Sequence, residues 1–257
     1  MPYVDVTGMR VWHEVLGEPA DGTAPVVLLH GGMASASSWS GQTPGLTGAG
    51  YQVYLPERRG HGHTPDQPGP ITYSLMAGDT IAYLDQVVAR PAHLIGWSDG
   101  AVVALLAAQR RPDLAASLVL IGQYFNSAGR VQGGLTDLLV NADEQVTGFL
   151  RESYAKESPD GPGHFDEIYG KVTQMWRTEP EIDLATLGNV GMPAMVLQGD
   201  RDEVKLGHSA AVASALGEGR LAVLPGTHLL PIESPELVTS LLLAAIRGWP
   251  PGLMEAD

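Results

Sequence analysis

Short runs of continuous apolar residues recur along this chain, and segments of helix length separate most of them. One run, Val26-Val27-Leu28-Leu29, stops at His30-Gly31-Gly32. The others lie at residues 51–55, 92–95, 118–121, 194–197 and 221–224. Apolar runs bounded by turn residues are typical of strands buried on both faces. Strands that alternate with helices predict an α/β fold around a mainly parallel sheet, with helices on both faces.

Residues 122–192 interrupt this rhythm, because they separate two core strands by far more chain than a crossover needs. Two polar helical segments are expected here, at roughly 135–156 and 165–177. The sequence Ser158-Pro159-Asp160-Gly161-Pro162-Gly163 between them is a loop-forming cluster. The simplest interpretation is a helical insertion.

These patterns divide the chain into two parts. We expect residues 1–122 and 192–257 to form the core that contains the sheet, and residues 123–191 to form a helical cap over it. Alternating residues around Thr7-Gly8 predict that the core opens with a β-hairpin. The tail from Gly248 has few anchoring residues, so we expect it to fray.

The composition excludes several classes of function. The chain has 15 Lys and Arg against 29 Asp and Glu, a net charge of -14, which would repel nucleic acids and anionic lipid surfaces. It has no cysteine, which excludes disulfides, thiolate metal sites and a cysteine nucleophile. We find neither a leader segment nor a run of about 18 apolar residues. We therefore expect a cytoplasmic protein with no nucleic-acid or membrane partner.

The sequence Gly96-Trp97-Ser98-Asp99-Gly100 stands between an apolar strand and a helix-like run that starts at Ala101. This order matches a G-x-S-x-G elbow, in which a serine on a strained turn projects its hydroxyl from the top of the sheet. The pattern alone is common, but the strand, turn and helix context makes Ser98 the predicted nucleophile. The alternative is an ordinary turn between a strand and a helix.

A serine nucleophile needs a base within hydrogen-bond reach and a third group that orients the base. Asp200 and Asp202 follow the apolar run at 194–197, and His228 follows the run at 221–224. Both positions come after the carboxyl ends of strands, where open α/β sheets bind ligands. His228 is the predicted base, and either aspartate could orient it. The other aspartate could bond the backbone of its own turn.

Taken together, these motifs make nearly the whole chain resemble a capped α/β-hydrolase. The order of serine, acid and histidine along the chain is that of this family. Its Gly-x-x-Asp pattern falls on Gly199 and Asp202, and its Gly-x-His pattern with a following acid and proline falls on Gly226-Thr227-His228 and Glu233-Ser234-Pro235. The resemblance implies a mostly parallel eight-stranded sheet with a helical cap, and it selects Asp202 over Asp200.

Acyl transfer develops negative charge on the former carbonyl oxygen, and each preorganised N–H donor can stabilise it by roughly 3 kcal/mol. The resemblance places these donors on the backbone of Gly32 and of Asp99, which follows the nucleophile. Met33 is an alternative to Gly32. The two glycines could also serve only a tight exit from the strand. We expect His30 to be structural.

The segment from Glu57 to Thr64 resembles the family pattern D-x-R-G-x-G-x-S, with Glu for Asp and Thr for Ser. We interpret Arg59 as a buried ion-pair partner. His61 and His63 lie two residues apart on this loop, but no carboxylate or cysteine pattern completes a metal site. The sequence therefore predicts no metal and no other cofactor.

Asp99 is the residue that bears on the substrate. A carboxylate beside the reacting carbonyl disfavours anions, whereas an ammonium group about 4 Å away would gain roughly 4 kcal/mol before desolvation. The elbow Gly-Trp-Ser-Asp-Gly is similar to that of the valacyclovir hydrolase family, the biphenyl hydrolase-like proteins. In that family the acid after the nucleophile binds the α-amino group of an amino-acid ester. Alternatively, Asp99 only interacts with the helix dipole, at about 0.3 to 1 kcal/mol.

The sequence thus predicts a serine hydrolase that cleaves carboxylic esters, preferably α-amino-acid esters, through an acyl-enzyme. Ser98 attacks, His228 transfers the proton, Asp202 orients His228, and the N–H groups of Gly32 and Asp99 hold the oxyanion. The expected partner is a small-molecule ester, and the expected state is a monomer or small homo-oligomer.

Several other activities share this fold and triad, among them peptidase, lactonase, perhydrolase and carbon–carbon hydrolase. A ligand-binding protein with low turnover is the alternative from another class. Haloalkane dehalogenases and the related epoxide hydrolases use an aspartate nucleophile, so Ser98 argues against both. The cap residues Tyr124, Phe125, Glu157 and Trp176 could shape the pocket or simply pack the cap onto the sheet.

Overall fold

A computed structural model describes residues 2–248, so most of the tail expected to fray lies outside the described residues. One eight-stranded sheet has the order β1-β2-β4-β3-β5-β6-β7-β8. Its strands are β1 (Tyr3–Val6), β2 (Met9–Leu16), β3 (Val26–Leu29), β4 (Val53–Pro56), β5 (Ala92–Trp97), β6 (Ala115–Ile121), β7 (Ala194–Gly199) and β8 (Gly219–Leu224). β1 and β2 form the predicted hairpin, β2 pairs antiparallel with β4, and the remaining neighbours are parallel. The predicted mostly parallel sheet is confirmed.

The burial of the strands follows their place in the sheet. Every residue of β3, β5 and β7 is buried, because each of these strands has a neighbour on both sides and helices on both faces. β8 instead exposes Leu221 and Val223, because it is the edge strand. An apolar run therefore predicted the strand correctly at β8 but overestimated its burial.

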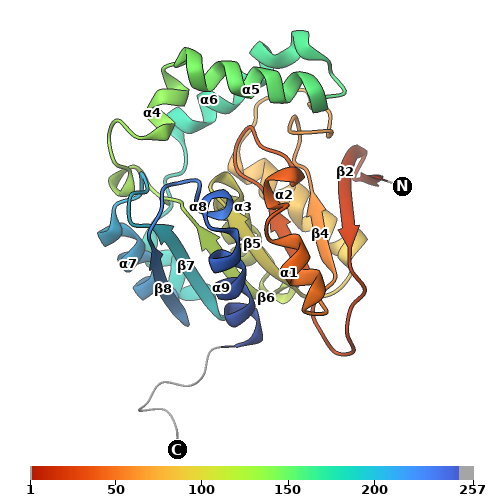
Figure 1. Ribbon diagram of the computed structural model, residues 1–257, viewed down its shortest axis with the longest axis vertical. Helices are drawn as coiled ribbons and strands as arrows, with labels where there is room; N and C mark the ends of the chain where they lie inside the picture. The colour runs from red at the N-terminus through yellow and green to blue at the C-terminus, as the bar shows by residue number, and fades with distance from the viewer. Residues whose placement is uncertain (1, 249–257) are drawn as a thin grey trace, which may run out of the picture.

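Helices cover both faces of the sheet, as predicted (Figure 1). They are α1 (Thr43–Gly48), α2 (Tyr73–Tyr83), α3 (Asp99–Arg110), α7 (Leu206–Ala215), α8 (Leu230–Glu233) and α9 (Pro235–Arg247). α1 and α9 pack into one apolar cluster, and α2, α3 and α7 pack into the cluster on the opposite face. The two clusters make the sheet a rigid platform for the loops at its edge.

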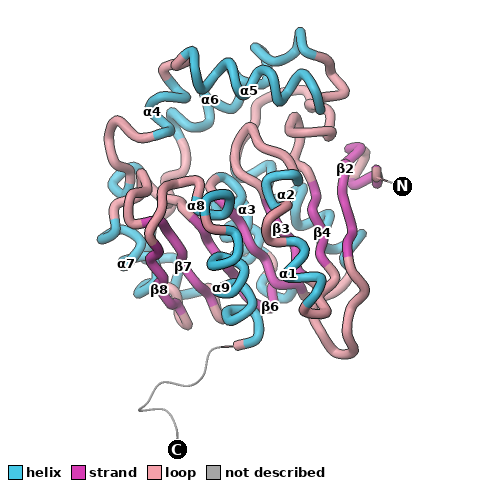
Figure 2. Tube along the Cα trace, in the orientation of Figure 1, coloured by secondary structure: helices cyan, strands magenta, loops and turns pink. Residues whose placement is uncertain are grey.

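Three further helices, α4 (Leu135–Val140), α5 (Glu144–Glu157) and α6 (Phe165–Thr178), stand over one edge of the sheet (Figures 1 and 2). The single helix expected at 135–156 is broken, because Ala142 has a φ of 57° and Asp143 is the N-cap of a new helix, α5. The Asp143 carboxylate accepts hydrogen bonds from the N–H groups of Gln145 and Val146, which is a typical N-cap. The sequence signal for this break is the turn-forming Asn141-Ala142-Asp143.

The insertion between β6 and β7 also packs against the core. The turns Ser127–Gly129 and Leu184–Asn189, near its two ends, both contact α7. α4, α5 and α6 are therefore the part that stands over the sheet edge. The boundaries predicted for the cap, residues 123–191, stay a prediction.

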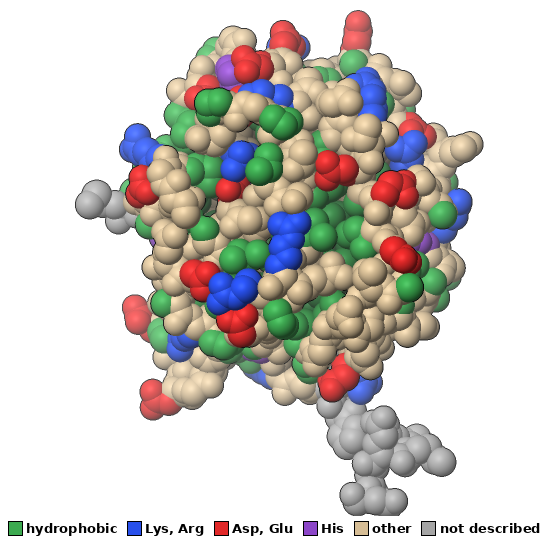
Figure 3. All heavy atoms as spheres, turned by 180° about the vertical axis from the view of Figure 1, so that it is seen from behind, with side chains coloured by type: hydrophobic (Ala, Val, Ile, Leu, Met, Phe, Trp, Pro, Cys, Tyr) green, Lys and Arg blue, Asp and Glu red, His purple; other side chains and the backbone are tan. Residues whose placement is uncertain are grey.

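The composition disfavours nucleic acids and membranes as partners, and two features of the structure are relevant to them. On the face shown in Figure 3, basic side chains are scattered among acidic ones and do not gather into a patch. Within residues 2–248, no helix is both long enough and apolar enough to span a bilayer.

Candidate active site

The turn between β5 and α3 holds Ser98 in a strained backbone conformation. Its φ of 55° and ψ of -126° lie in a region that residues with a side chain rarely adopt. Both flanking glycines are sterically required. A Cβ on Gly96 would lie 2.1 Å from the backbone oxygen of Gly100, and a Cβ on Gly100 would lie 2.1 Å from that of Leu29. The chain therefore forms the elbow that the glycine spacing predicts.

The structure brings Ser98, His228 and Asp202 together in one chain of hydrogen bonds. His228 Nε2 lies 3.0 Å from Ser98 Oγ, and His228 Nδ1 lies 2.9 Å from Asp202 Oδ1. The indole N–H of Trp97 donates to the backbone oxygen of His228 at 2.9 Å, which holds the imidazole beside the elbow. With Nδ1–H donated to the carboxylate, Nε2 is free to accept the serine proton.

Other acidic residues near the triad position backbone. Asp200, the alternative acid, accepts from the N–H of Gly226 at 2.9 Å instead of contacting the imidazole. Glu233 accepts from the N–H of Thr227 at 2.8 Å and from its hydroxyl at 2.7 Å. The acid that follows His228 in the sequence, Glu233, therefore fixes the turn that carries it.

Gly122 packs against Asp202 and His228, and no motif in the sequence predicted this contact. Its φ is 59°, and a Cβ there would lie 2.9 Å from Asp202 Oδ2 and 3.5 Å from His228 Nδ1. Its N–H donates to the backbone oxygen of Leu197 at 2.8 Å. The available signal was a glycine directly after β6, where a left-handed turn suits glycine best.

The charges around His228 favour its protonated form. Burial lowers the pKa of His228, but the hydrogen bond and negative charge of Asp202 outweigh it, with further help from Glu203 and Asp99. The pKa of His228 is therefore raised above its ordinary value. An imidazole with a raised pKa accepts a proton from a neighbouring hydroxyl more readily.

The loop after β3 lies against the elbow. A Cβ on Gly31 would be 3.4 Å from Ser98 Cβ, and one on Gly32 would be 2.3 Å from Asp99 Oδ2. Met33 has a φ of 54°, so the chain turns sharply here. Within residues 2–248, the N–H groups of Gly32 and Asp99 donate to no protein acceptor. Both predicted oxyanion donors thus stand beside the nucleophile with their hydrogen atoms unused.

The Asp99 carboxylate joins the elbow to the cap. It is 2% exposed and accepts from the Tyr73 hydroxyl at 2.6 Å and from the Trp176 indole N–H at 3.0 Å to each oxygen. Burial raises the pKa of Asp99, although Arg58, Tyr73 and Trp176 act to lower it. From the sequence, Trp176 is predicted only as a possible pocket residue, and no motif marks Tyr73.

Arg58, and not Arg59, is the arginine that contacts the loop after β3. Its guanidinium donates to the backbone oxygens of His30 at 2.5 Å and Gly31 at 2.9 Å, so it braces the loop after β3. Burial lowers the pKa of Arg58 to about 10, which leaves it charged near Asp99. Arg59 pairs with Asp79 through two hydrogen bonds of 2.7 and 2.8 Å. Arg59 thus has the expected ion-pair partner, but it is half-buried instead of buried.

His61 and His63 have separate partners. His61 Nδ1 lies 2.8 Å from the backbone oxygen of Arg59, and burial lowers the pKa of His61 to about 3. His63 Nδ1 lies 3.2 Å from Glu57 Oε2. The spacing that could suggest a metal pair instead places the two imidazoles in different hydrogen bonds.

A cavity of about 740 Å³ lies between the sheet edge and the cap. Its floor includes Ser98, Trp97 and His228, and its roof includes residues of α4, α5 and α6. The lining contains carboxylates but neither lysine nor arginine. A substrate here would meet apolar and hydroxyl groups and a negative electrostatic potential.

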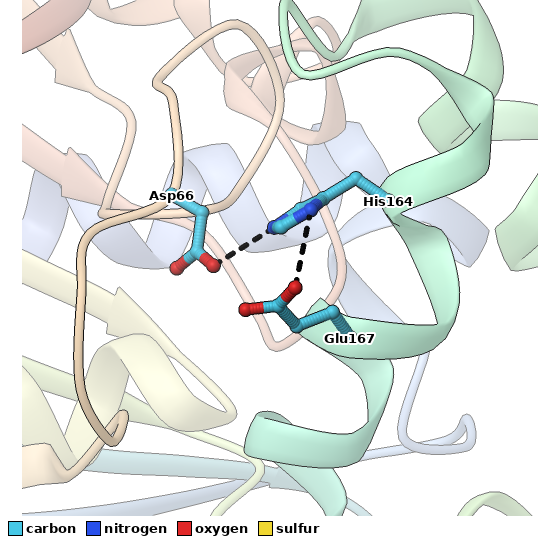
Figure 4. A group of neighbouring side chains, drawn as sticks. All are labelled: Asp66, His164 and Glu167. Atoms are coloured by element: carbon cyan, nitrogen blue, oxygen red, sulfur yellow. Dashed lines mark hydrogen bonds and ion pairs between the residues drawn. The ribbon is translucent and has the colours of Figure 1, made fainter.

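Asp66, His164 and Glu167 form the group whose atoms could converge on a metal (Figure 4). His164 Nε2 lies 2.9 Å from Asp66 Oδ2, and its Nδ1 lies 3.5 Å from Glu167 Oε2. The Lys171 ammonium group contacts Asp66 and lies 3.3 Å from Glu167 Oε1. A cation of the protein therefore already offsets these carboxylates, and the group links the cap to the loop after β4.

The alpha/beta hydrolase family model matches residues 26–241, well over half of the chain. The chain belongs to the alpha/beta hydrolase family.

Two curated relatives of this chain are named for different activities. The chain is 38% identical over 125 residues to epoxide hydrolase B of Mycobacterium tuberculosis, covering 48% of this chain and 35% of that protein. It is 41% identical over 96 residues to the pimeloyl-[acyl-carrier protein] methyl ester esterase of Methylococcus capsulatus, covering 37% and 35%. The alignment thus spans about a third of each relative's length.

The solved structure of 2-hydroxy-6-oxo-6-phenylhexa-2,4-dienoate hydrolase from Rhodococcus sp. strain RHA1 matches with a TM-score of 0.74. The two chains are 20% identical, and the match covers 96% of this chain and 98% of that one. A likeness at this identity shows the shared fold alone. The comparisons therefore establish the family and the fold, and the activity has to be argued from the site and its pocket.

Proposed function

We propose that this chain is a serine hydrolase that cleaves carboxylic esters through an acyl-enzyme. The observation that carries the proposal is the unbroken chain of hydrogen bonds from Ser98 Oγ through His228 to Asp202. This arrangement activates a hydroxyl as a nucleophile and returns the proton to the leaving group.

The mechanism follows from the geometry. His228 Nε2 takes the proton as Ser98 Oγ attacks the carbonyl, and Asp202 stabilises the imidazolium. The N–H groups of Gly32 and Asp99 receive the developing oxyanion. His228 then protonates the leaving alcohol, and water attacks the acyl-enzyme by the same route in reverse. None of these steps needs a cofactor.

The nucleophile and the pocket charge separate this proposal from its closest alternatives. Members of the family that open epoxides use an aspartate where this chain has Ser98, so we favour ester cleavage. The Rhodococcus relative is named for a dienoate, which carries a carboxylate. The pocket described here has no lysine or arginine in its lining to bind one. A carbon–carbon hydrolase acting on such an acid is therefore the weaker candidate.

The narrower proposal, a preference for α-amino-acid esters, depends on Asp99. Its carboxylate lines the cavity, and two oxygens can accept more hydrogen bonds than Tyr73 and Trp176 donate. Against this preference, those donors and Arg58 already offset the charge of Asp99.

We also propose that the substrate is a small-molecule ester. We propose that the protein is cytoplasmic and is a monomer or a small homo-oligomer.

The test pairs chemical labelling with turnover. A fluorophosphonate should label wild-type protein at Ser98, and p-nitrophenyl acetate should be hydrolysed with sustained release of nitrophenol. Ser98→Ala should lose both. A ligand-binding protein would bind esters without sustained release, and that result would refute the proposal.

A valine ester and its des-amino counterpart, assayed on wild type and Asp99→Asn, test the preference for amino esters. Equal losses on both esters would remove it.

A further inference from the structure

One face of α5 lines the cavity, and its character changes along the helix. Val146, Phe149, Leu150, Ser153 and Glu157 all line the cavity. Their spacing of three and four residues places them on one side of a helix. Among these five residues, the apolar members lie toward the start of α5 and the polar members toward its end; Gln145 and Tyr154 of α5 line the cavity as well. We call the part of the cavity under Val146, Phe149 and Leu150 its apolar end, and the part under Ser153 and Glu157 its polar end.

The polar end contains hydroxyl groups around one carboxylate. Ser35 Oγ donates to Glu157 Oε1 at 3.2 Å and lies 2.8 Å from Ser37 Oγ. Ser38 and Ser40 line the same cavity. Ser35 lies on the loop that follows β3, so Glu157 of the cap meets the loop that also carries the predicted oxyanion donor.

Glu157 differs from the other two carboxylates of the cavity. Asp99 accepts from Tyr73 and Trp176, and Glu203 accepts from the backbone N–H and the hydroxyl of Thr136 at 2.8 and 2.7 Å. Within residues 2–248, Glu157 has one hydrogen bond, from Ser35, and no ion pair. It is thus the carboxylate of the cavity wall with the most acceptor capacity left for a ligand.

The position of Glu157 is unfavourable for the helix itself. It is the last residue of α5, where the helix dipole is negative and a cation is the stabilising choice. No lysine or arginine lines the cavity to offset it. Lys156 is the basic residue of this last turn, but it does not line the cavity. A positively charged ligand in the cavity would compensate the charge of the half-buried Glu157 carboxylate.

We propose that Glu157, together with the Ser35 hydroxyl, binds a positively charged group of the ester substrate, an ammonium or quaternary ammonium. The inference rests on the proposed ester hydrolase function and names its substrate class. It assigns recognition of the cation to the cap, so it is independent of the role of Asp99. The uncharged part of the substrate would occupy the apolar end beneath Val146, Phe149 and Leu150.

The experiment compares two esters of the same shape, choline butyrate and its uncharged carbon analogue 3,3-dimethylbutyl butyrate. Wild type should have the higher kcat/KM for the cationic ester. In Glu157→Gln the ratio of the two kcat/KM values should fall about tenfold, because the variant loses the Coulombic attraction between the carboxylate and the trimethylammonium group, with the neutral ester little affected. Glu152→Gln is the matched control, because Glu152 lies on the exposed side of the same helix. It should leave the ratio unchanged.

The outcomes separate the inference from the function on which it rests. An unchanged ratio in Glu157→Gln, with the neutral ester still cleaved, overturns the inference and leaves the hydrolase. If wild type cleaves neither ester, the proposed function fails for this substrate class. Binding of butyltrimethylammonium, measured by calorimetry, then decides: weaker binding in Glu157→Gln than in Glu152→Gln supports the cation site, and equal binding refutes it.

Discussion

The floor and the roof of the cavity are built by different physical means. The floor consists of Ser98, Asp202 and His228, which follow the ends of neighbouring or nearby strands of a buried sheet. Backbone hydrogen bonds and close-packed glycines fix these positions. The roof consists of α4, α5 and α6, and polar side chains join it to the core, Trp176 to Asp99 and Lys171 to Asp66.

This difference separates chemistry from selectivity. Sheet ends tolerate little displacement, so a proton-transfer chain placed there keeps its geometry. A helical roof held by side chains can vary its lining without disturbing that chain. We therefore expect substitutions in the floor to change catalysis by large factors and substitutions in the roof to change it by smaller ones.

The largest effect is expected from Asp202→Asn. Loss of the carboxylate removes the group that fixes the imidazole tautomer, and kcat should fall by roughly 10⁴-fold. Circular dichroism and thermal melting should show a folded protein. A loss below about tenfold would mean that another acid orients His228, and Asp200→Asn is the control that should retain activity.

The pH dependence of kcat/KM tests the same pair. Only neutral His228 can accept the serine proton, so the rate should rise with pH and level off above the pKa of His228. Because that pKa is raised, the midpoint should lie above about 6.5, with roughly tenfold loss per pH unit below it. A midpoint below 6.5 would contradict the electrostatics described for His228.

Trp176→Phe tests the connection between floor and roof. It removes one donor from the Asp99 carboxylate, and we expect about a tenfold loss of kcat with little change in folding. Tyr73→Phe should act in the same direction, because it removes the other donor. Because the proposed amino-ester preference depends on the Asp99 carboxylate, the loss should be larger for amino esters than for des-amino esters. An equal loss on both would show that Trp176 and Tyr73 only hold the elbow in place.

The smallest effect is expected from Asp66→Asn, which weakens the contact of the cap with the loop after β4. The partners are partly exposed, so the free energy of unfolding should drop by about 1 kcal/mol or less. Burial raises the pKa of Asp66, but Lys171 and His164 lower it further, so the net shift is downward. This stabilisation should thus be present above about pH 3.9 and vanish as the pH falls further. Thermal melts at pH 7 and at low pH measure it.

The sequence alone determined the sheet and brought the right residues to its edge. Apolar runs marked every central strand, and Gly96 and Gly100 marked the elbow, because backbone contacts there exclude any side chain. The choice of Asp202 over Asp200 needed family spacing. The residues next to Asp200 and Asp202 do not show which of the two carboxylates reaches His228 and which one bonds the backbone of a nearby turn.

Tertiary structure decided the contacts between segments far apart in the chain. Nothing local to Tyr73, Trp176 or Gly122 marks them as neighbours of Asp99 or Asp202, because those contacts form only when the cap and the sheet pack together. The same holds for Glu157, whose place on a helix was predictable but whose meeting with Ser35 was not. Periodicity reports which side of an element is buried, whereas long-range packing determines what that side touches.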